Sequence, residues 1–355
     1  MSIDYSFIKK IFRTFFTNPH LTPKKLINLA LAGFQYKFLR NPLVKTYPIR
    51  LIVDPANMCN LRCPLCPTGQ LKPTRNKAVM DLTHYKHLVD EVSDYLFEID
   101  LYNWGEPFLN PALFEMIEYA QNKNIRTTMS SNFNILNETM ARKLVESGLE
   151  QLTLSIDGAS PQSYIKYRVR GNFDRIVRNI KMLVKARKEL HKKNPRITWQ
   201  FLVMKHNEHE IEKARKMANE LGVDEIFFRP IRPDMGSELH MSDEEKYENA
   251  KPWLPKNEEY SRFSAKDHTK KKKYKLKSCL FLWTQASINS DGSVSPCCGV
   301  YDQKDDFGNA FLDGGFMKVW NNKTYQKARQ IASRQIPADN KLLCSKCVKN
   351  GFLEY

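Results

Sequence analysis

The 355-residue sequence lacks a run of the roughly 18 apolar residues that a membrane-spanning helix needs. Its most apolar stretch, residues 26–39, is too short and is interrupted by Asn28, Gln35 and Lys37. We also reject a secretory signal peptide, because residues 1–20 are too aromatic and too basic and because secretion would expose the thiols to oxidation. The sequence therefore predicts a cytoplasmic protein.

Acidic residues are nearly missing from two stretches. Residues 1–50 hold nine Lys and Arg against Asp4 alone, and residues 256–277 hold nine against three acids. These stretches carry 14 of the 17 excess positive charges, so the remainder of the chain is nearly balanced. A long nucleic-acid track is therefore not expected. A basic terminus fits an anionic membrane surface or an acidic partner better.

Cysteine is too sparse, at eight residues, for a disulfide scaffold. Its grouping in CNLRCPLC (Cys59, Cys63 and Cys66) and in CSKC (residues 344–347) indicates metal ligation in a reducing compartment. No fourth cysteine follows the first group until Cys279, whereas a structural zinc site normally closes with four nearby ligands. The first site therefore keeps an open coordination position.

Residues 1–17 have the pattern of an amphipathic helix. The apolar side chains at helical spacing are Phe7, Ile8, Ile11, Phe12, Phe15 and Phe16, and Lys9, Lys10 and Arg13 lie opposite. Such a face fits either the inner surface of a membrane, which would make the protein peripheral there, or packing on the remainder of the chain. Thr22 followed by Pro23 predicts the start of a second helix.

From residue 50, short β-rich runs alternate with helical stretches. The six predicted strands cover residues 50–54, 97–102, 125–130, 152–157, 197–204 and 225–229. The helical stretches include residues 111–122, 138–147, 172–193 and 208–220. This alternation favours an α/β fold in which a parallel sheet curls into a partial (β/α)6 TIM-like barrel. The chemistry of such barrels lies in the loops after the strands, and the first of these loops holds CNLRCPLC.

The chain divides into four predicted parts. Residues 1–48 are an amphipathic helical extension, and residues 49–235 form the barrel. Residues 236–278, which contain a run of lysines, are interpreted as a solvated basic linker. Residues 279–355 form a small C-terminal α+β domain.

CNLRCPLC, followed by GEP at residues 105–107, resembles the signature of radical S-adenosylmethionine (radical SAM) enzymes. The resemblance implies that Cys59, Cys63 and Cys66 hold three irons of a [4Fe-4S] cluster whose fourth iron binds SAM. A reductant such as flavodoxin or ferredoxin would then drive cleavage of SAM to a 5′-deoxyadenosyl radical that abstracts hydrogen from a substrate. A zinc-stabilised binding protein is the alternative from another class.

The same resemblance implies a set of SAM-binding residues at the strand ends. They are Leu65, Gly105, Glu106, Ser130, Asn132, Ser155, Asp157 and Arg168. Trp104 stands where the family usually has a first glycine. Each polar residue alone would also fit a strand-end cap or turn.

The C-terminal cysteines resemble the auxiliary-cluster domains called SPASM and twitch. The four predicted ligands of one auxiliary [4Fe-4S] cluster are Cys279, Cys297, Cys344 and Cys347. A zinc ribbon is the alternative for this site. DGSV at residues 291–294 predicts a hairpin turn. Cys298 is not needed for this ligand set. It could be a free thiol, a substitute ligand for Cys297 or a hydrogen donor to a substrate radical.

An auxiliary cluster implies an oxidative modification, such as dehydrogenation of an alcohol to a carbonyl. The expected substrate is a small molecule, a sugar or a lipid-linked compound at a membrane, and the alternative is a ribosomally made peptide that the enzyme matures. Arg229 and Arg232 are candidates to face an anionic substrate, although they also fit plain surface arginines. His206 is a candidate acid–base residue.

Overall fold

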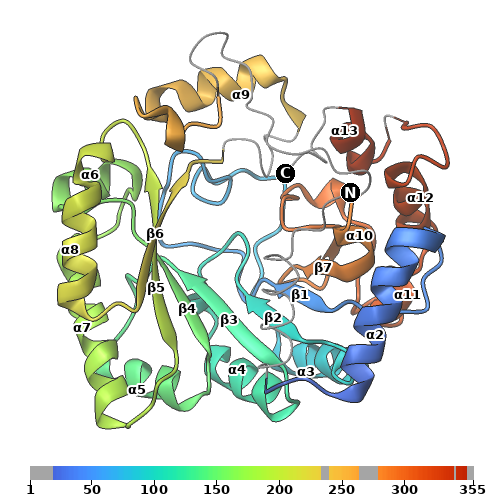
Figure 1. Cartoon of the computed structure of the whole chain (residues 1–355), viewed down its shortest axis with the longest axis horizontal. Coiled ribbons are helices and arrows are strands. Elements are labelled where there is room, and N and C mark those ends of the chain that lie inside the picture. Colours follow the sequence, from blue (N-terminus) through green and yellow to red (C-terminus); the bar gives the residue numbers. More distant parts are fainter. Residues whose placement is uncertain (1–18, 233–239, 264–278, 340, 350–355) are drawn as a thin grey trace, which may run out of the picture.

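The computed structural model describes residues 19–232, 240–263, 279–339 and 341–349 (Figure 1). The amphipathic helix predicted over residues 1–17 and the lysine run at residues 270–277 lie outside the described residues.

The six predicted strands form one parallel sheet in chain order. They are β1 (Arg50–Val53), β2 (Glu98–Leu101), β3 (Arg126–Ser131), β4 (Gln151–Ser155), β5 (Arg196–Val203) and β6 (Glu225–Pro230). Each strand pairs in parallel with the next, from Arg50 opposite Glu98 on β1 and β2 to Thr198 opposite Glu225 on β5 and β6. The predicted α/β fold is therefore confirmed.

Helices cover one face of this sheet, on the outside of the curve (Figure 1). They are α3 (Leu82–Val92), α4 (Leu113–Asn122), α5 (Glu138–Glu146), α6 (Pro161–Tyr167), α7 (Phe173–Glu189) and α8 (Ile211–Leu221). Strand alternation sends Leu152 and Leu154 into the core under these helices, while Thr153 is only half-buried on the other face. The uncovered face therefore presents polar side chains to the space in front of the sheet.

The C-terminal region extends this sheet. Strand β7 (Gln285–Ile288) pairs in parallel with β1, and β8 (Val294–Ser295) pairs antiparallel with β7 through the predicted turn, where Gly292 has φ +82°. Trp283 and Trp320 belong to the same hydrophobic core as the barrel. The region is thus not a body with a core of its own, because β7 satisfies the edge of β1 that a six-stranded barrel leaves unpaired. Its helices are α10 (Phe281–Thr284), α11 (Phe316–Trp320), α12 (Lys323–Ala332) and α13 (Leu343–Lys349).

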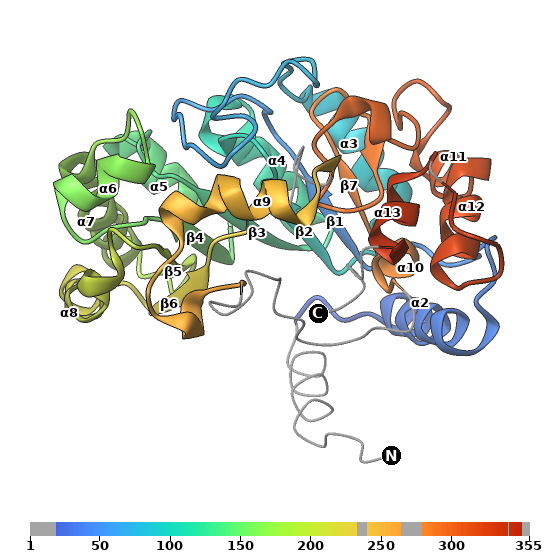
Figure 2. The same cartoon turned by 90° about the horizontal axis from the view of Figure 1, so that it is seen from above.

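The prediction of a solvated linker is wrong for residues 240–263. This segment contains α9 (Asp243–Ala250), which begins with a capping box between Ser242 and Glu245. Ala250 and Phe263 are buried in a small cluster with residues of the cysteine-bearing loop. Apolar side chains inside a polar segment therefore decide its packing, and Figure 2 shows α9 lying across the open side of the sheet.

Candidate active site

A cavity of about 180 Å³ opens where the carboxyl ends of the strands meet the cysteine-bearing loop. Its lining residues are Cys59, Leu61, Cys63, Cys66, Tyr102, Asn103, Trp104, Gly105, Glu106, Ser130, Ser131, Asn132, Ser155, Tyr167, Arg168 and Leu202. All three predicted cluster ligands and six of the eight predicted SAM-binding residues line it. Leu65 and Asp157 do not.

Close backbone packing holds the cysteine loop against the next loop. A Cβ on Gly105 would lie 1.5 Å from the carbonyl oxygen of Ala56, so only glycine fits there. The next backbone N–H, that of Glu106, donates to the carbonyl of Met58 at 2.8 Å. The GEP motif therefore has a structural task, which is to seat the loop after β2 against the chain that leads into Cys59.

The thiols of the first site are buried and lie near hydrogen-bond donors. Burial raises the pKa of Cys59 to about 12 and that of Cys63 to about 11. The side-chain amide of Asn132 lies 3.6 Å from Cys59 Sγ, and Nη1 of Arg168 lies 3.9 Å from Cys63 Sγ. Free thiols would stay neutral here, whereas these donors and a bound metal would both favour thiolates.

The spacing of the sulfurs fits a cluster better than a single zinc ion. Tetrahedral zinc with bonds of ~2.3 Å would bring its thiolates about 3.8 Å apart. Among the described residues, no three cysteine sulfurs lie mutually within 4.8 Å. A cluster, which presents a separate iron to each thiolate, needs such wider spacing. The three thiols of the first loop, which has no fourth cysteine beside it, therefore fit an iron-sulfur cluster with one open iron.

Glu106 organises the end of β3. Its carboxylate, almost fully buried, accepts hydrogen bonds from the Ser131 hydroxyl at 2.7 Å and from the backbone N–H of Asn132 at 2.8 Å. Burial raises the pKa of Glu106 to about 7 although these donors oppose the shift. Asn132 in turn donates to Asn60 at 2.8 Å, which connects this carboxylate to the cysteine loop.

Arg168 is the cation of the cavity, and Asp157 positions it. Arg168 directly follows α6, where the helix carbonyls favour a cation. Its Nε donates to Asp157 Oδ2 at 2.6 Å, and Asp157 Oδ1 accepts from the backbone N–H of Leu202 at 2.8 Å. Asp157 has no exposed surface. It was predicted to contact SAM, but the structure makes it a support for the guanidinium that lines the cavity.

The remaining predicted residues divide between the cavity and its surroundings. Ser130 and Ser155, on neighbouring strands, face each other with their hydroxyl oxygens 3.1 Å apart. Leu65 instead packs in the apolar cluster behind the cysteines. His206 lies away from the cavity, with its ring against Trp253 at 5.6 Å, so the structure does not support an acid–base role.

The four C-terminal cysteines form the second site. Burial raises the pKa of Cys297 and Cys344 well above the usual value; the adjacent thiol of Cys298 adds to this effect at Cys297, and the thiols of Cys279 and Cys347 add to it in both cases. Four thiols brought together from three separate stretches match the predicted ligand set. Burial also raises the pKa of Cys298, while the charges of Arg232 and of the barrel residue Arg50 oppose the shift.

The charges of Arg50 and Asp100 connect Cys298 to the barrel. Burial also raises the pKa of Tyr102, to which Asp100 and Cys298 contribute, and Tyr102 lines the first cavity. Arg229, at the end of β6, is exposed and stacks its guanidinium on Phe227 at 4.6 Å. Neither Arg229 nor Arg232 lines the first cavity, so their role toward an anionic substrate stays a prediction.

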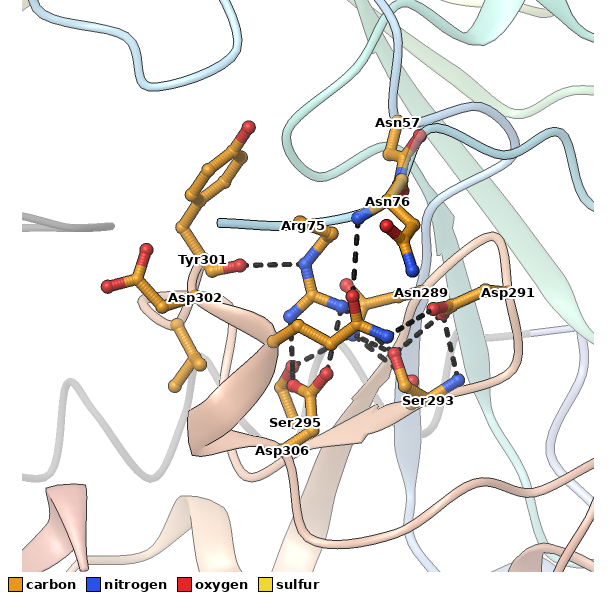
Figure 3. A network of polar contacts seen from close by, with 12 residues as sticks. Asn57, Arg75, Asn76, Asn289, Asp291, Ser293, Ser295, Tyr301, Asp302 and Asp306 are labelled. Carbon is orange, nitrogen blue, oxygen red and sulfur yellow. Dashed lines mark hydrogen bonds and ion pairs between the residues drawn. The ribbon is translucent and has the colours of Figure 1, made fainter. Parts of the chain in front are cut away.

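Sequence reasoning missed Arg75, a buried arginine that ties the cysteine-loop side to the C-terminal hairpin (Figure 3). Its Nε donates to the carbonyl of Tyr301 at 2.7 Å, Nη1 donates to the Ser293 hydroxyl at 2.9 Å, and Nη2 donates to Asp306 at 2.9 Å. Every arm of the guanidinium is occupied, and a buried ion pair with Asp306 neutralises it. Arg75 therefore fixes the loop that follows Cys297.

Trp104 makes a second connection to the same loop. Its indole Nε1–H donates to the carbonyl of Val300 at 2.7 Å, and its ring packs edge-on against Tyr301 at 5.5 Å. Its departure from the family's usual glycine was the one signal in the sequence that marked it.

Comparison with known proteins agrees with this site. Residues 53–218 match the model of the Radical SAM superfamily, and residues 279–348 match the SPASM model, an iron-sulfur cluster-binding domain. Residues 53–218 therefore form a radical SAM domain. The C-terminal part of the chain is a SPASM domain, so the cofactors are a SAM-binding [4Fe-4S] cluster with SAM and an auxiliary iron-sulfur cluster.

Relatives named for different reactions are similar to parts of this chain. An AdoMet-dependent heme synthase of Methanosarcina barkeri is 29% identical over 221 residues, which are 59% of this chain and 58% of that protein. A probable GTP 3′,8-cyclase of Methanococcus maripaludis is 25% identical over 188 residues, 52% of this chain and 60% of the relative. The match spans less than two thirds of either relative.

Solved structures share the fold. SuiB of Streptococcus suis bound to the precursor peptide SuiA has a TM-score of 0.60 at 13% identity and covers 88% of this chain and 73% of its own. The enzyme anSMEcpe with bound AdoMet has a TM-score of 0.55 at 16% identity and covers 81% of each chain. At these identities the likeness concerns the fold alone.

Proposed function

We propose that this radical SAM enzyme carries out an oxidative modification in which the auxiliary cluster accepts an electron from the substrate. The hydrogen bond from Trp104 to Val300 carries the proposal. Trp104 lines the cavity of the first cysteine site, and Val300 is three residues from Cys297 of the second. Trp104 thus connects the cavity of the first site to the loop that follows Cys297, which supports a path for an electron from a substrate in the barrel to the auxiliary cluster.

Each residue has a task in this proposal. Cys59, Cys63 and Cys66 would hold the first cluster, while Arg168 and the polar groups at the strand ends would bind and orient SAM beside it. When bound, the clusters and SAM supply one-electron chemistry that removes hydrogen from an unactivated carbon. The segment that carries α9 helps to keep water from the site, because it packs on the cysteine loop and across the open side of the sheet (Figure 2).

The uncovered face of the sheet supports a polar substrate. Thr153 and Gln200 are half-buried there and offer hydroxyl and amide groups. A small hydroxyl-bearing molecule, such as a sugar or an alcohol on a larger carrier, would find hydrogen-bond partners on this wall. Dehydrogenation of its alcohol to a carbonyl would remove a hydrogen atom, which the 5′-deoxyadenosyl radical would take, a proton, which would pass to solvent, and an electron, which the auxiliary cluster would accept.

Iron content tests the assignment of the two sites. We expect anaerobically purified protein to be brown with about eight irons per chain, and the C59A/C63A/C66A variant to keep about four. The C298A variant is the control and should keep about eight. A colourless protein with stoichiometric zinc would overturn the proposal.

Release of 5′-deoxyadenosine tests the reaction. Reduced enzyme should release it from SAM faster when a substrate is present, so we would offer the lipid and the water-soluble fractions of host cells separately. Stimulation by either fraction supports the proposal and gives a pool to fractionate. An oxidative reaction also requires that products carry two fewer hydrogens than the substrate, which mass spectrometry measures.

A peptide is the second candidate substrate, favoured by strand β6. Among the described strands it pairs with β5 alone, at the end of the sheet, and an extended peptide can add to such an edge. The fold is also similar to that of SuiB, which was solved with a precursor peptide. Stimulation by a peptide fraction that protease treatment abolishes would select this candidate over the small alcohol.

A further inference from the structure

The N-terminal helix has its polar and apolar sides reversed. Helix α2 (Pro23–Phe34) and the π-helical turn η1 that continues it (Gln35–Leu39) bury Lys25 and Asn28 against the protein. The large apolar side chains on the other side are 40–64% exposed: Leu26, Ile27, Leu31, Phe34, Phe38 and Leu39. A surface helix normally turns its apolar side to the core, so this orientation needs an explanation.

Specific hydrogen bonds fix this orientation. The Lys25 ammonium donates to the backbone carbonyl of Asn124. The Asn28 side chain donates to the carbonyl of Tyr47 at 3.1 Å and accepts from the Tyr47 N–H at 3.0 Å. The side-chain oxygen of Thr22 caps the helix at its start. The polar side is therefore built to face inward, and turning the helix over would leave these buried groups without partners.

The exposed apolar residues form one continuous stripe. Ile27, Leu31, Phe34 and Phe38 follow one another at intervals of four, three and four residues, which places them on one side of a helix. The Phe34 and Phe38 rings lie 5.2 Å apart, and Leu43, 55% exposed, follows in the next segment. Figure 2 shows α2 at the outer margin of the molecule beside the C-terminal helices.

The charged side chains of the segment that carries the stripe are all basic, and one of them, Lys24, is paired with Asp94 of the body of the protein. No Asp or Glu occurs between residues 5 and 53, while Lys24, Lys37 and Lys45 are exposed. Lys24 pairs with Asp94 at 2.6 Å, and the Lys37 ammonium lies 5.3 Å from the Phe38 ring centroid. Apolar side chains flanked by lysines match the two layers of an anionic membrane surface, in which acyl chains lie below phosphate headgroups.

We propose that the outer face of α2 and η1 docks the enzyme on an anionic phospholipid bilayer. Within the described part of the chain, no helix has the length and apolar character to cross a membrane, so the contact would be peripheral. The aromatic and aliphatic stripe would enter the interface, and the lysines would stay at the headgroups. This proposal is independent of the reaction that the enzyme catalyses.

Vesicle flotation tests the proposal on the full chain. The probes are vesicles of phosphatidylcholine alone and vesicles in which one third of the lipid is phosphatidylglycerol. We expect the wild type to float with the anionic vesicles and less so at high salt. The F34S/F38S variant should bind at least about tenfold more weakly, because two large apolar side chains no longer enter the interface. L312S is the matched control, since Leu312 is 81% exposed outside this helix and should not contribute.

Iron content and the thermal unfolding temperature of both variants establish that each is folded. Equal vesicle binding by the wild type and F34S/F38S would overturn the proposal. Such a result would assign the binding to another part of the chain, such as the apolar side chains of residues 1–18. A wild type that ignores both vesicles would overturn it as well. A wild-type dimer that F34S/F38S converts to a monomer would assign the face to a second copy of the chain instead of lipid.

Discussion

The indole N–H of Trp104 donates a 2.7 Å hydrogen bond to the backbone carbonyl of Val300, a residue with no exposed surface. The contact joins the loop after β2, which lines the first cysteine site, to the loop after Cys297 and Cys298. Arg75 holds the same loop through the carbonyl of Tyr301. Side chains from the barrel thus set the position of the auxiliary-cluster loop relative to the SAM site.

Replacing Trp104 by Phe keeps an aromatic ring but removes the donor. We expect the unfolding free energy to fall by about 1–3 kcal/mol, because the Val300 carbonyl stays buried without its partner. The electron paramagnetic resonance signal of the reduced auxiliary cluster should change while that of the SAM-binding cluster is retained. Unchanged spectra and stability would mean that this hydrogen bond does not position the loop.

Replacing Asp157 by Asn should weaken SAM binding by about tenfold, since Arg168 loses the carboxylate that orients it in the cavity. The buried guanidinium would also lose its counter-charge, at a cost of about 3 kcal/mol in unfolding free energy. Titration of SAM and urea unfolding measure the two effects. D224N is the control for SAM affinity, because it breaks another Arg–Asp pair, the more exposed Arg187–Asp224, outside the site. Equal SAM affinity in D157N and D224N would contradict the positioning role.

Replacing Gly105 by Ala should abolish incorporation of the first cluster. The new methyl group would occupy the position of the Ala56 carbonyl, so the chain leading to Cys59 must move. G33A is the matched control, because no atom lies within 4 Å of the added Cβ and alanine favours the helix by up to ~1 kcal/mol. Iron analysis should show a loss of about four irons in G105A and none in G33A. Full iron in G105A would refute the packing argument.

The buried Lys25 should make stability depend on pH in the alkaline range. Burial lowers the pKa of Lys25 to about 8 from 10.5, so the unfolded chain holds this proton up to a higher pH than the folded chain does. The unfolding free energy contributed by Lys25 should therefore rise with pH between about 8 and 10.5, by roughly 2 kcal/mol from pH 7.5 to 9.5.

Urea unfolding of the wild type and K25M at the two pH values measures this rise, which K25M should lack. The neighbouring Lys24 is the control, because it is exposed and its pKa is raised by the hydrogen bond to Asp94, so K24M should keep the rise. A constant difference between wild type and K25M would contradict a buried amine.

Local spacing made much of this protein predictable from its sequence. The cysteine spacing defines a ligand set with an open position, and the alternation of β-rich and helical stretches yields β1 to β6 in order. The turn at DGSV and the start of α2 at Thr22 also follow from residues next to one another in the chain. These features depend on interactions over a few residues, which is the range that periodicity and caps report.

The tertiary structure decided what depends on distant residues. The pairing of β7 with β1, the burial of residues 240–263 and the supporting role of Asp157 all arise from contacts between separate stretches. Arg75 and Trp104 gave no local sign of their partners, because hydrogen bonds to backbone carbonyls more than 190 positions away leave no pattern in the sequence. The sequence alone determined which atoms can bind the clusters. Only the fold decided how far apart the two sites lie and which side of α2 faces outward, because both depend on which buried polar groups find partners.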